Sequence, residues 1–252
     1  MLIVVSPAKR LNEHPPRADG GTLPRNLDQA EILADTARRL DAPALQKLMH
    51  ISPKLAALNV ERFAAFGSGV GEKPAIEMFA GDTYAGLEAA SLEPDELAYA
   101  QDHLRILSGL YGLLRPGDVI QPHRLEMGSR LTNERGRNLY DFWGDRIAGQ
   151  LMADATAVGT DVLVNCASVE YFTAADRPAL GLRVITPVFY EDHPDGPRIH
   201  SFFAKKARGA MARFIIQNRL TDPEALKEFD TGGYRYRPDM SEGDRLVFLN
   251  AG

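Results

Sequence analysis

Positively charged side chains without neighbouring acids mark one segment as a candidate phosphate site. Lys205, Lys206 and Arg208 lie within residues 203–213, together with Arg213, and this stretch contains no Asp or Glu. In a helix, Lys205 and Arg208 share a face, whereas Lys206 points about 100° away from Lys205. Cations near a helix start suit a phosphate, because the helix dipole adds to their charge. The alternative is a solvated helix face, and the spacing favours neither interpretation.

A second candidate segment covers residues 107–128 and combines glycines with charges. Arg115, Arg124 and Glu126 stand there among four glycines. Glycine lets backbone N–H groups approach a ligand closely. The segment has neither a Gly-Lys-Ser/Thr phosphate loop nor the glycine spacing of a dinucleotide fingerprint. The alternative is a pair of tight turns, but Arg115, Arg124 and Glu126 in so apolar a stretch argue for a task or a partner.

Two further candidates follow predicted strands. Asn165, Ser168 and Glu170 come after one strand, and Lys9 comes after the first strand of the chain. Ligands gather at the carboxyl ends of strands in α/β sheets, so these side chains are candidate phosphate ligands. Glu126, Glu170 and Lys9 are also the catalytic candidates. A carboxylate beside cations can act as a general base, or it can simply hold an arginine in position.

The remaining chemistry-bearing residues predict neither a metal site nor a cofactor. The six histidines never lie three or four residues apart, and no His-Glu-x-x-His pattern occurs. The single cysteine, Cys166, is more typical of a small buried hydrophobe than of a nucleophile. It has no second cysteine for an internal disulfide, which favours a cytoplasmic location. The first residues lack the features of a secretory signal, and no apolar run is long enough for a bilayer, so we expect no membrane association.

The elements that must position these residues alternate between strands and helices. The predicted strands are Leu2–Val5, Leu104–Ser108, Asp161–Cys166, Leu182–Tyr190 and Val247–Leu249, with Arg198–Phe202 pairing beside the fourth. The predicted helices are Leu27–Leu40, Ala44–Met49, Pro53–Phe63, Leu139–Ala155 and Ala204–Arg219. We expect residues 110–127 to form an ordered loop. The order predicts a mixed α/β fold of one domain over residues 1–252, with a mixed sheet, surrounding helices and a helical sub-region at 26–66.

The charge distribution limits how the chain can meet nucleic acid. The net charge is −5 and the isoelectric point is about 5.7, which argues against a polycationic coat protein. A local basic cleft stays compatible with this total, because a cleft focuses the field of the charges that line it. Residues 74–104 contain seven acids and no Lys or Arg, so we expect this section to face away from any phosphate backbone.

Several motifs together resemble the YaaA family, the bacterial peroxide-stress proteins. They run in family order from end to end and are Ser6–Lys9, Phe79–Gly86, Leu107–Gly128, Asn138–Gly144, Asn165–Tyr171 and Phe203–Gly209. The segment Leu48–Leu58 also resembles the hairpin of helix-hairpin-helix DNA binders, with Ser52 and Pro53 in place of the usual glycines. There Lys54 would contact phosphate. The alternative for that segment is an ordinary helical turn.

The family resemblance implies a single α/β domain with a positively charged cleft that binds DNA without strong sequence demands. It also implies a role in peroxide stress, in which free intracellular iron is kept low and DNA is spared oxidation. By the resemblance, the cleft would be lined by Lys9, Arg115, Arg124, Lys205, Lys206 and Arg208. His123 stands where the family has a Tyr, so one wall would differ.

Three hypotheses follow. The first is a DNA-binding protein of the peroxide stress response. The second is an enzyme that acts on a nucleotide-like or phosphorylated small molecule, because Glu126 and Glu170 exceed what backbone binding needs. The third is direct sequestration of iron, for which the sequence offers no ligand spacing.

Overall fold

The computed structural model describes residues 1–12, 14–17 and 20–250 of the chain. Its strands are β1 (Leu2–Val5), β2 (Lys73–Pro74), β3 (Leu104–Ser108), β4 (Gly112–Leu114), β5 (Val119–Ile120), β6 (Val162–Cys166), β7 (Arg183–Glu191), β8 (Tyr234–Tyr236) and β9 (Arg245–Asn250). Its α-helices are α1 (Leu27–Arg38), α2 (Ala42–Met49), α3 (Pro53–Ala64), α4 (Ala75–Met78), α5 (Asp82–Leu87), α6 (Pro94–His103), α7 (Leu139–Trp143), α8 (Arg146–Ala157), α9 (Val169–Phe172) and α10 (Ser201–Asn218).

A seven-stranded mixed sheet forms the centre of the molecule, in the order β4-β3-β1-β6-β7-β9-β8. The five inner strands run parallel, and β4 and β8 are antiparallel at the two edges. β1 is buried along its whole length, as expected for a continuous apolar run inside a parallel sheet. The predicted mixed α/β fold of one domain is confirmed.

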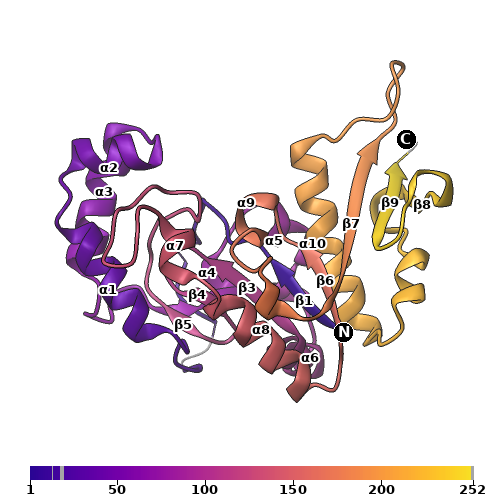
Figure 1. Ribbon diagram of the computed structural model, residues 1–252, viewed down its shortest axis with the longest axis horizontal. Coiled ribbons are helices and arrows are strands. Elements are labelled where there is room, and N and C mark those ends of the chain that lie inside the picture. The colour runs from indigo at the N-terminus through magenta and orange to yellow at the C-terminus, as the bar shows by residue number, and fades with distance from the viewer. Residues whose placement is uncertain (13, 18–19, 251–252) are drawn as a thin grey trace.

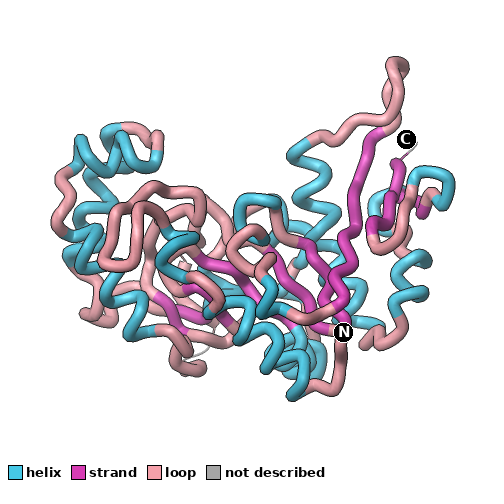
Figure 2. Tube along the Cα trace, in the orientation of Figure 1, coloured by secondary structure: helices cyan, strands magenta, loops and turns pink. Residues whose placement is uncertain are grey.

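The helices lie around the sheet and at one end of it (Figure 1). α1, α2 and α3 form a helical lobe at the end opposite β8 and β9, within the predicted helical sub-region 26–66. α10 packs along β1, β6 and β7, and α5 lies on α10. Figure 2 shows loops between this lobe and the sheet. Within the described residues, no helix combines the length and apolar character needed to cross a bilayer.

The contact between α5 and α10 depends on two glycines. A Cβ atom at Gly209 would lie 1.7 Å from the backbone oxygen of Thr83, and one at Gly86 would lie 1.9 Å from that of Lys206. Real side chains never approach so closely, so only glycine permits this helix spacing. The two helices therefore approach closely enough to carry Asp82 and Lys205 on walls of one cavity.

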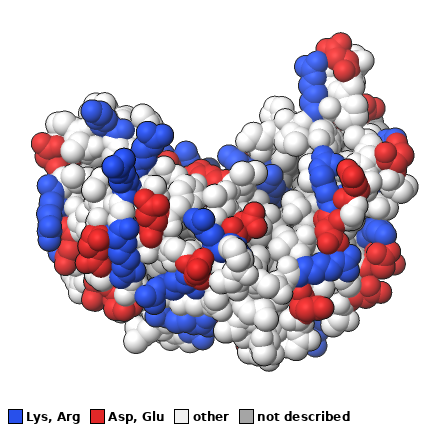
Figure 3. All heavy atoms as spheres, viewed as in Figure 1, with Lys and Arg blue, Asp and Glu red and all other residues white. Residues whose placement is uncertain are grey.

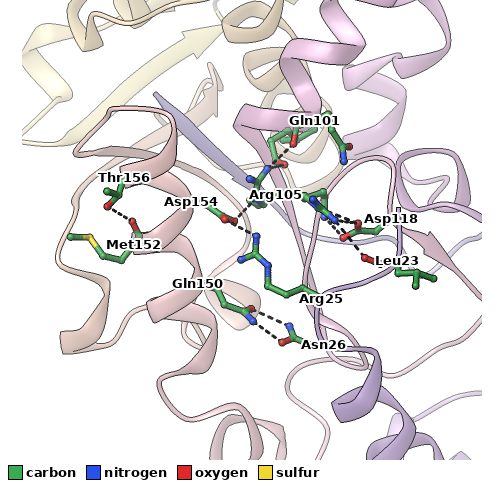
Figure 4. A network of polar contacts seen from close by, with 12 residues as sticks. Leu23, Arg25, Asn26, Gln101, Arg105, Asp118, Gln150, Met152, Asp154 and Thr156 are labelled. Carbon is green, nitrogen blue, oxygen red and sulfur yellow. Dashed lines mark hydrogen bonds and ion pairs between the residues drawn. The ribbon is translucent and has the colours of Figure 1, made fainter. Parts of the chain in front are cut away.

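A buried polar network ties the start of α1 to the sheet (Figure 4). The Asp154 carboxylate accepts hydrogen bonds from Arg105 Nε at 2.6 Å and from Arg25 Nη2 at 2.7 Å. Burial alone would raise the pKa of Asp154, but the two arginine hydrogen bonds outweigh it and hold that pKa below its usual value. Next to it, Asn26 and Gln150 exchange two side-chain hydrogen bonds.

The sequence predictions for two segments are wrong. Residues 139–155 are not one helix, because Gly144 adopts φ 48° and ψ −125° and separates α7 from α8. Residues 198–202 are not a strand: Arg198 makes one isolated bridge with Glu191, and α10 already begins at Ser201. The loop predicted at 110–127 contains the short strands β4 and β5.

Candidate functional site

A cavity of about 460 Å³ opens where β1, β3 and β6 end. The chain leaves β1 toward β3 on one side, and leaves β6 toward β7 on the other side. This reversal is where α/β sheets bind ligands. We call it the strand-end cavity. Its lining includes five cations and three carboxylates, namely Lys9, Arg10, Arg124, Lys205, Arg208, Asp82, Glu126 and Glu170.

The wall on α10 carries two cations, Lys205 and Arg208. Lys205 is exposed and Arg208 is half-buried, and both line the cavity. In the part of the chain that the structure describes, neither side chain makes an ion pair or a hydrogen bond. Burial lowers the pKa of Arg208 from its usual value, yet a guanidinium stays charged at any physiological pH. This wall therefore offers positive charge to a ligand.

The facing wall carries cations that are already paired. Glu126 Oε1 accepts hydrogen bonds from Arg124 at 2.8 and 3.1 Å, and Lys9 Nζ lies 3.2 Å from the same oxygen. The side chains of Glu126 and Arg124 are 17% and 15% exposed, whereas that of Lys9 is 66% exposed. One carboxylate thus holds two of the predicted phosphate ligands, which reduces the charge that this wall presents.

The ends of β1 and β6 form the floor. The Ser168 N–H donates to Ser6 Oγ at 2.9 Å, and the Ser6 hydroxyl donates to Ser168 Oγ at 3.3 Å. The Tyr84 hydroxyl donates to the Ser6 carbonyl oxygen at 3.2 Å. Beside them, Cys166 is 1% exposed, and burial raises the pKa of its thiol to about 12. Cys166 is therefore protonated at neutral pH, which agrees with its interpretation as a buried hydrophobe.

His123 contributes a neutral ring to the lining. Burial lowers its pKa to about 4. Its Nδ1 lies 2.9 Å from the Gln121 carbonyl oxygen, so Nδ1 carries the proton and donates. The ring meets Phe79 and Tyr111 edge-on. It adds no charge to the cavity at neutral pH.

The second carboxylate candidate lies in the same cavity and has its own partner. Glu170 Oε1 accepts a hydrogen bond from the Gly128 N–H at 2.9 Å. Burial raises the pKa of the neighbouring Tyr171, and the charges of Glu170 and Glu126 raise it further. The charges of the two carboxylates thus both act on one phenol.

Most predicted site residues meet in the strand-end cavity. Lys9, Arg124, Glu126, Ser168, Glu170, Lys205 and Arg208 line it.

Three of the predicted residues lie outside the lining. Arg115 pairs with Asp118, with Nη2 3.1 Å from Oδ1. The Asn165 side chain is buried and accepts from the Ala167 N–H at 3.0 Å. Lys206 is exposed but does not line the cavity.

Sequence reasoning missed Asp82 and Thr83, which line the cavity from the start of α5. Both belong to the Phe79–Gly86 motif, so the signal was present. Asp82 lies in the acidic section 74–104, which we expect to face away from any phosphate backbone, and it nevertheless lines the cavity.

The segment Leu48–Leu58 forms the end of α2, a three-residue turn and the start of α3. His50 is left-handed at φ 52°, and Ser52 Oγ accepts from the Leu55 N–H at 3.3 Å. Lys54 is exposed at the start of α3. Lys54 therefore lies on the helical lobe and not in the lining of the strand-end cavity.

Comparison with known proteins identifies the relatives of this chain. The family model described as peroxide stress protein YaaA matches residues 1–240. A UPF0246 protein of Ruegeria pomeroyi is 60% identical over 252 residues, covering 99% of this chain and 98% of its own length. A UPF0246 protein of Cereibacter sphaeroides is 60% identical over the whole of both chains, and one of Dinoroseobacter shibae is 57% identical over 99% of this chain and 94% of its own.

Proposed function

We propose, because the chain belongs to the peroxide stress protein YaaA family, that it acts in peroxide stress by binding DNA through phosphate groups at the strand-end cavity. The observation that carries this proposal is the pair Lys205 and Arg208. Both line the cavity without a carboxylate partner among the described residues. Bound in this way, the protein would help to limit free intracellular iron and oxidative DNA damage.

The charge of the α10 wall supports an anionic ligand. A half-buried guanidinium loses hydrogen bonds to water, and only a hydrogen-bond acceptor can replace them. A phosphate offers several acceptor oxygens at a spacing that matches the N–H donors of the guanidinium. Lys205 and Arg208 share a helix face, so one phosphate can meet both. Lys9 and Arg124 contribute less, because Glu126 already holds them.

The shape of the surface supports a ligand larger than one phosphate. Figure 3 shows the molecule hollowed between the helical lobe and α10, with Lys and Arg side chains on both sides of the hollow. We include the exposed Lys54 at the start of α3 as a second backbone contact in this proposal. Such an arrangement suits a strand that crosses from the lobe to the cavity.

The test is DNA binding across a salt series with a matched pair of variants. Lys205→Ala and Lys206→Ala remove the same charge from adjacent exposed positions, and only Lys205 lines the cavity. If the cavity binds phosphate, Lys205→Ala and Arg208→Gln lower the affinity, and each reduces the salt slope by about one. Lys206→Ala leaves both nearly unchanged. Equal losses of DNA affinity in Lys205→Ala and Lys206→Ala would show that binding depends on the overall positive charge of this surface and not on the cavity.

The iron component has its own measurement. Cells that lack the protein should contain more free iron after peroxide treatment, measured by electron paramagnetic resonance of chelated iron. Complementation with the Lys205→Ala, Arg208→Gln double variant tests whether DNA binding and iron limitation share the cavity. Full rescue by that variant would separate the two roles.

A second candidate function is an enzyme that acts on a nucleotide-like or phosphorylated small molecule. It is favoured by Glu126, a carboxylate fixed by two cations inside the cavity. Binding to a DNA phosphate backbone does not need a carboxylate, whereas general base catalysis needs a group that can accept a proton. Glu126→Gln would abolish turnover of a phosphorylated substrate while the fold stays intact. For a pure DNA binder, the same change removes a negative charge and leaves DNA binding equal or stronger.

A further inference from the structure

The strand-end cavity is too small for a DNA duplex. Its volume of about 460 Å³ falls in the range of small-molecule sites, about 300–1,000 Å³. A duplex can therefore touch only its rim. One monomer unit of a strand, or a free molecule of that size, can fill it.

The inside of the cavity combines aromatic rings with fixed carboxylate acceptors. Phe79, His123 and Tyr171 are all buried and all line the cavity. His123 is neutral, so its ring behaves as a flat polar surface and not as a cation. The Glu126 carboxylate lines the same space and can accept an N–H from a heterocycle edge. These groups suit a nucleobase, which has two flat faces and a polar edge.

A second aromatic surface, which we call the rim, lies on α10 one helical turn before Lys205. Phe202 and Phe203 are 50% and 46% exposed, with ring centroids 5.3 Å apart. Phe202 lies three residues before Lys205 on α10, so both project from neighbouring positions of one helix face. Exposed aromatic rings beside cations are the usual platform for unpaired bases. This rim would serve only a ligand that continues outside the cavity.

We propose that the strand-end cavity takes one nucleotide unit, with its phosphate on Lys205 and Arg208 and its base among Phe79, His123 and Tyr171. The unit is either a free nucleoside monophosphate or a nucleotide unstacked from a strand, and in a strand the neighbouring base stacks on Phe202. The proposal deepens the proposed function and rests on the same phosphate contacts.

The first experiment titrates adenosine 5′-monophosphate, adenosine and inorganic phosphate separately into the protein by calorimetry. The nucleotide should bind more tightly than either part, because the cavity engages both. Lys205→Ala should weaken it about tenfold, as expected for one charge-assisted contact, and Lys206→Ala should not change it. Lys205-dependent binding in this experiment would identify a free nucleotide as the ligand.

The second experiment compares a fully paired duplex with the same duplex containing one unpaired 2-aminopurine. The unpaired nucleotide should raise the affinity, and 2-aminopurine fluorescence should change on binding with wild type but not with Lys205→Ala. Phe202→Ala should weaken this complex about tenfold by removing a stacked base, while binding of the free nucleotide stays unchanged. A Lys205-dependent signal in this experiment would identify an unstacked nucleotide of a DNA strand as the ligand.

Either positive arm supports the proposal and names its source. If neither the nucleotide nor the unpaired base gives a Lys205-dependent signal while the protein is folded, the proposal is overturned. In that case, duplex binding with a Lys205-dependent salt slope would still uphold the proposed function. Nucleotide binding without any DNA binding would reject the DNA proposal and keep the nucleotide site.

Discussion

At the scale of single residues, His123 is a titrating group whose ionisation the fold opposes. Burial lowers its pKa from 6.5 to about 4. Between these values the unfolded chain takes up a proton that the folded chain does not. The free energy of unfolding therefore decreases as the pH falls from 6.5 to 4, by about 3 kcal/mol in total, and His123 has no such effect above 6.5.

The variant His123→Asn tests this pH dependence. Asn keeps an N–H that can donate to the Gln121 carbonyl oxygen but does not titrate. Urea unfolding at about pH 7.5 and about pH 5 should show a loss of stability in wild type that is about 2 kcal/mol larger than in the variant. The exposed His193→Asn is the control and should keep the wild-type difference. An unchanged difference in His123→Asn would assign the acid sensitivity to another group.

Single residues also show how far the sequence could predict the site. The three-residue spacing of Lys205 and Arg208 was enough to assign both to one face, because helical period decides direction. Arg115 could not be assigned in this way. Its partner Asp118 lies three residues on in a loop, where no period fixes which side chains meet. The pairing of Lys9 with Glu126 joins two distant segments, so no local pattern contains it.

At the scale of elements, the contact of α5 with α10 sets the width of the cavity. Gly209→Ala would drive a methyl group into the Thr83 carbonyl oxygen, 1.7 Å from the added Cβ. We expect a loss of about 1–3 kcal/mol in the free energy of unfolding, because the helices must separate. We also expect weaker ligand binding, because α10 carries Lys205 and Arg208. Urea unfolding and the salt-dependent DNA titration measure the two effects.

A second helical glycine provides the control. A Cβ at Gly149 in α8 meets nothing within 4 Å. Gly149→Ala should therefore stabilise the protein by up to about 1 kcal/mol through helix propensity. If Gly209→Ala were equally harmless, the close approach of α5 and α10 would not be needed for stability.

Elements also mark the limit of the sequence predictions. Strands β1, β3 and β6 were predictable, because short apolar β-branched runs have few other uses in a soluble fold. The break at Gly144 was not, since the apolar stripe from Leu139 to Leu151 continues across it with helical period. The false strand at 198–202 arose from the exposed apolar residues Ile199 and Phe202, which the sequence cannot distinguish from buried ones.

At the scale of the whole molecule, a net charge of −5 must be reconciled with an anionic ligand. Asp95 of α6 lies near the amino ends of the parallel strands, away from the cavity at their carboxyl ends, because its partner Arg219 precedes Leu220, whose carbonyl oxygen accepts a hydrogen bond from the Met1 amino group. Asp82 differs, because it lines the cavity from α5. The position of a charge should therefore affect DNA affinity more than the net charge of the protein does.

Two variants that change the total charge equally test this conclusion. Asp82→Asn removes a negative charge from the cavity wall and should raise DNA affinity at low salt about two- to fivefold, an effect that added salt suppresses. Asp95→Asn removes the same charge from the opposite end of the sheet, and screening over that distance should leave the affinity nearly unchanged. Fluorescence anisotropy with a labelled duplex at two salt concentrations measures both. An equal rise in DNA affinity in the two variants would mean that binding depends on the overall charge of the protein. The cavity would then not be the DNA contact.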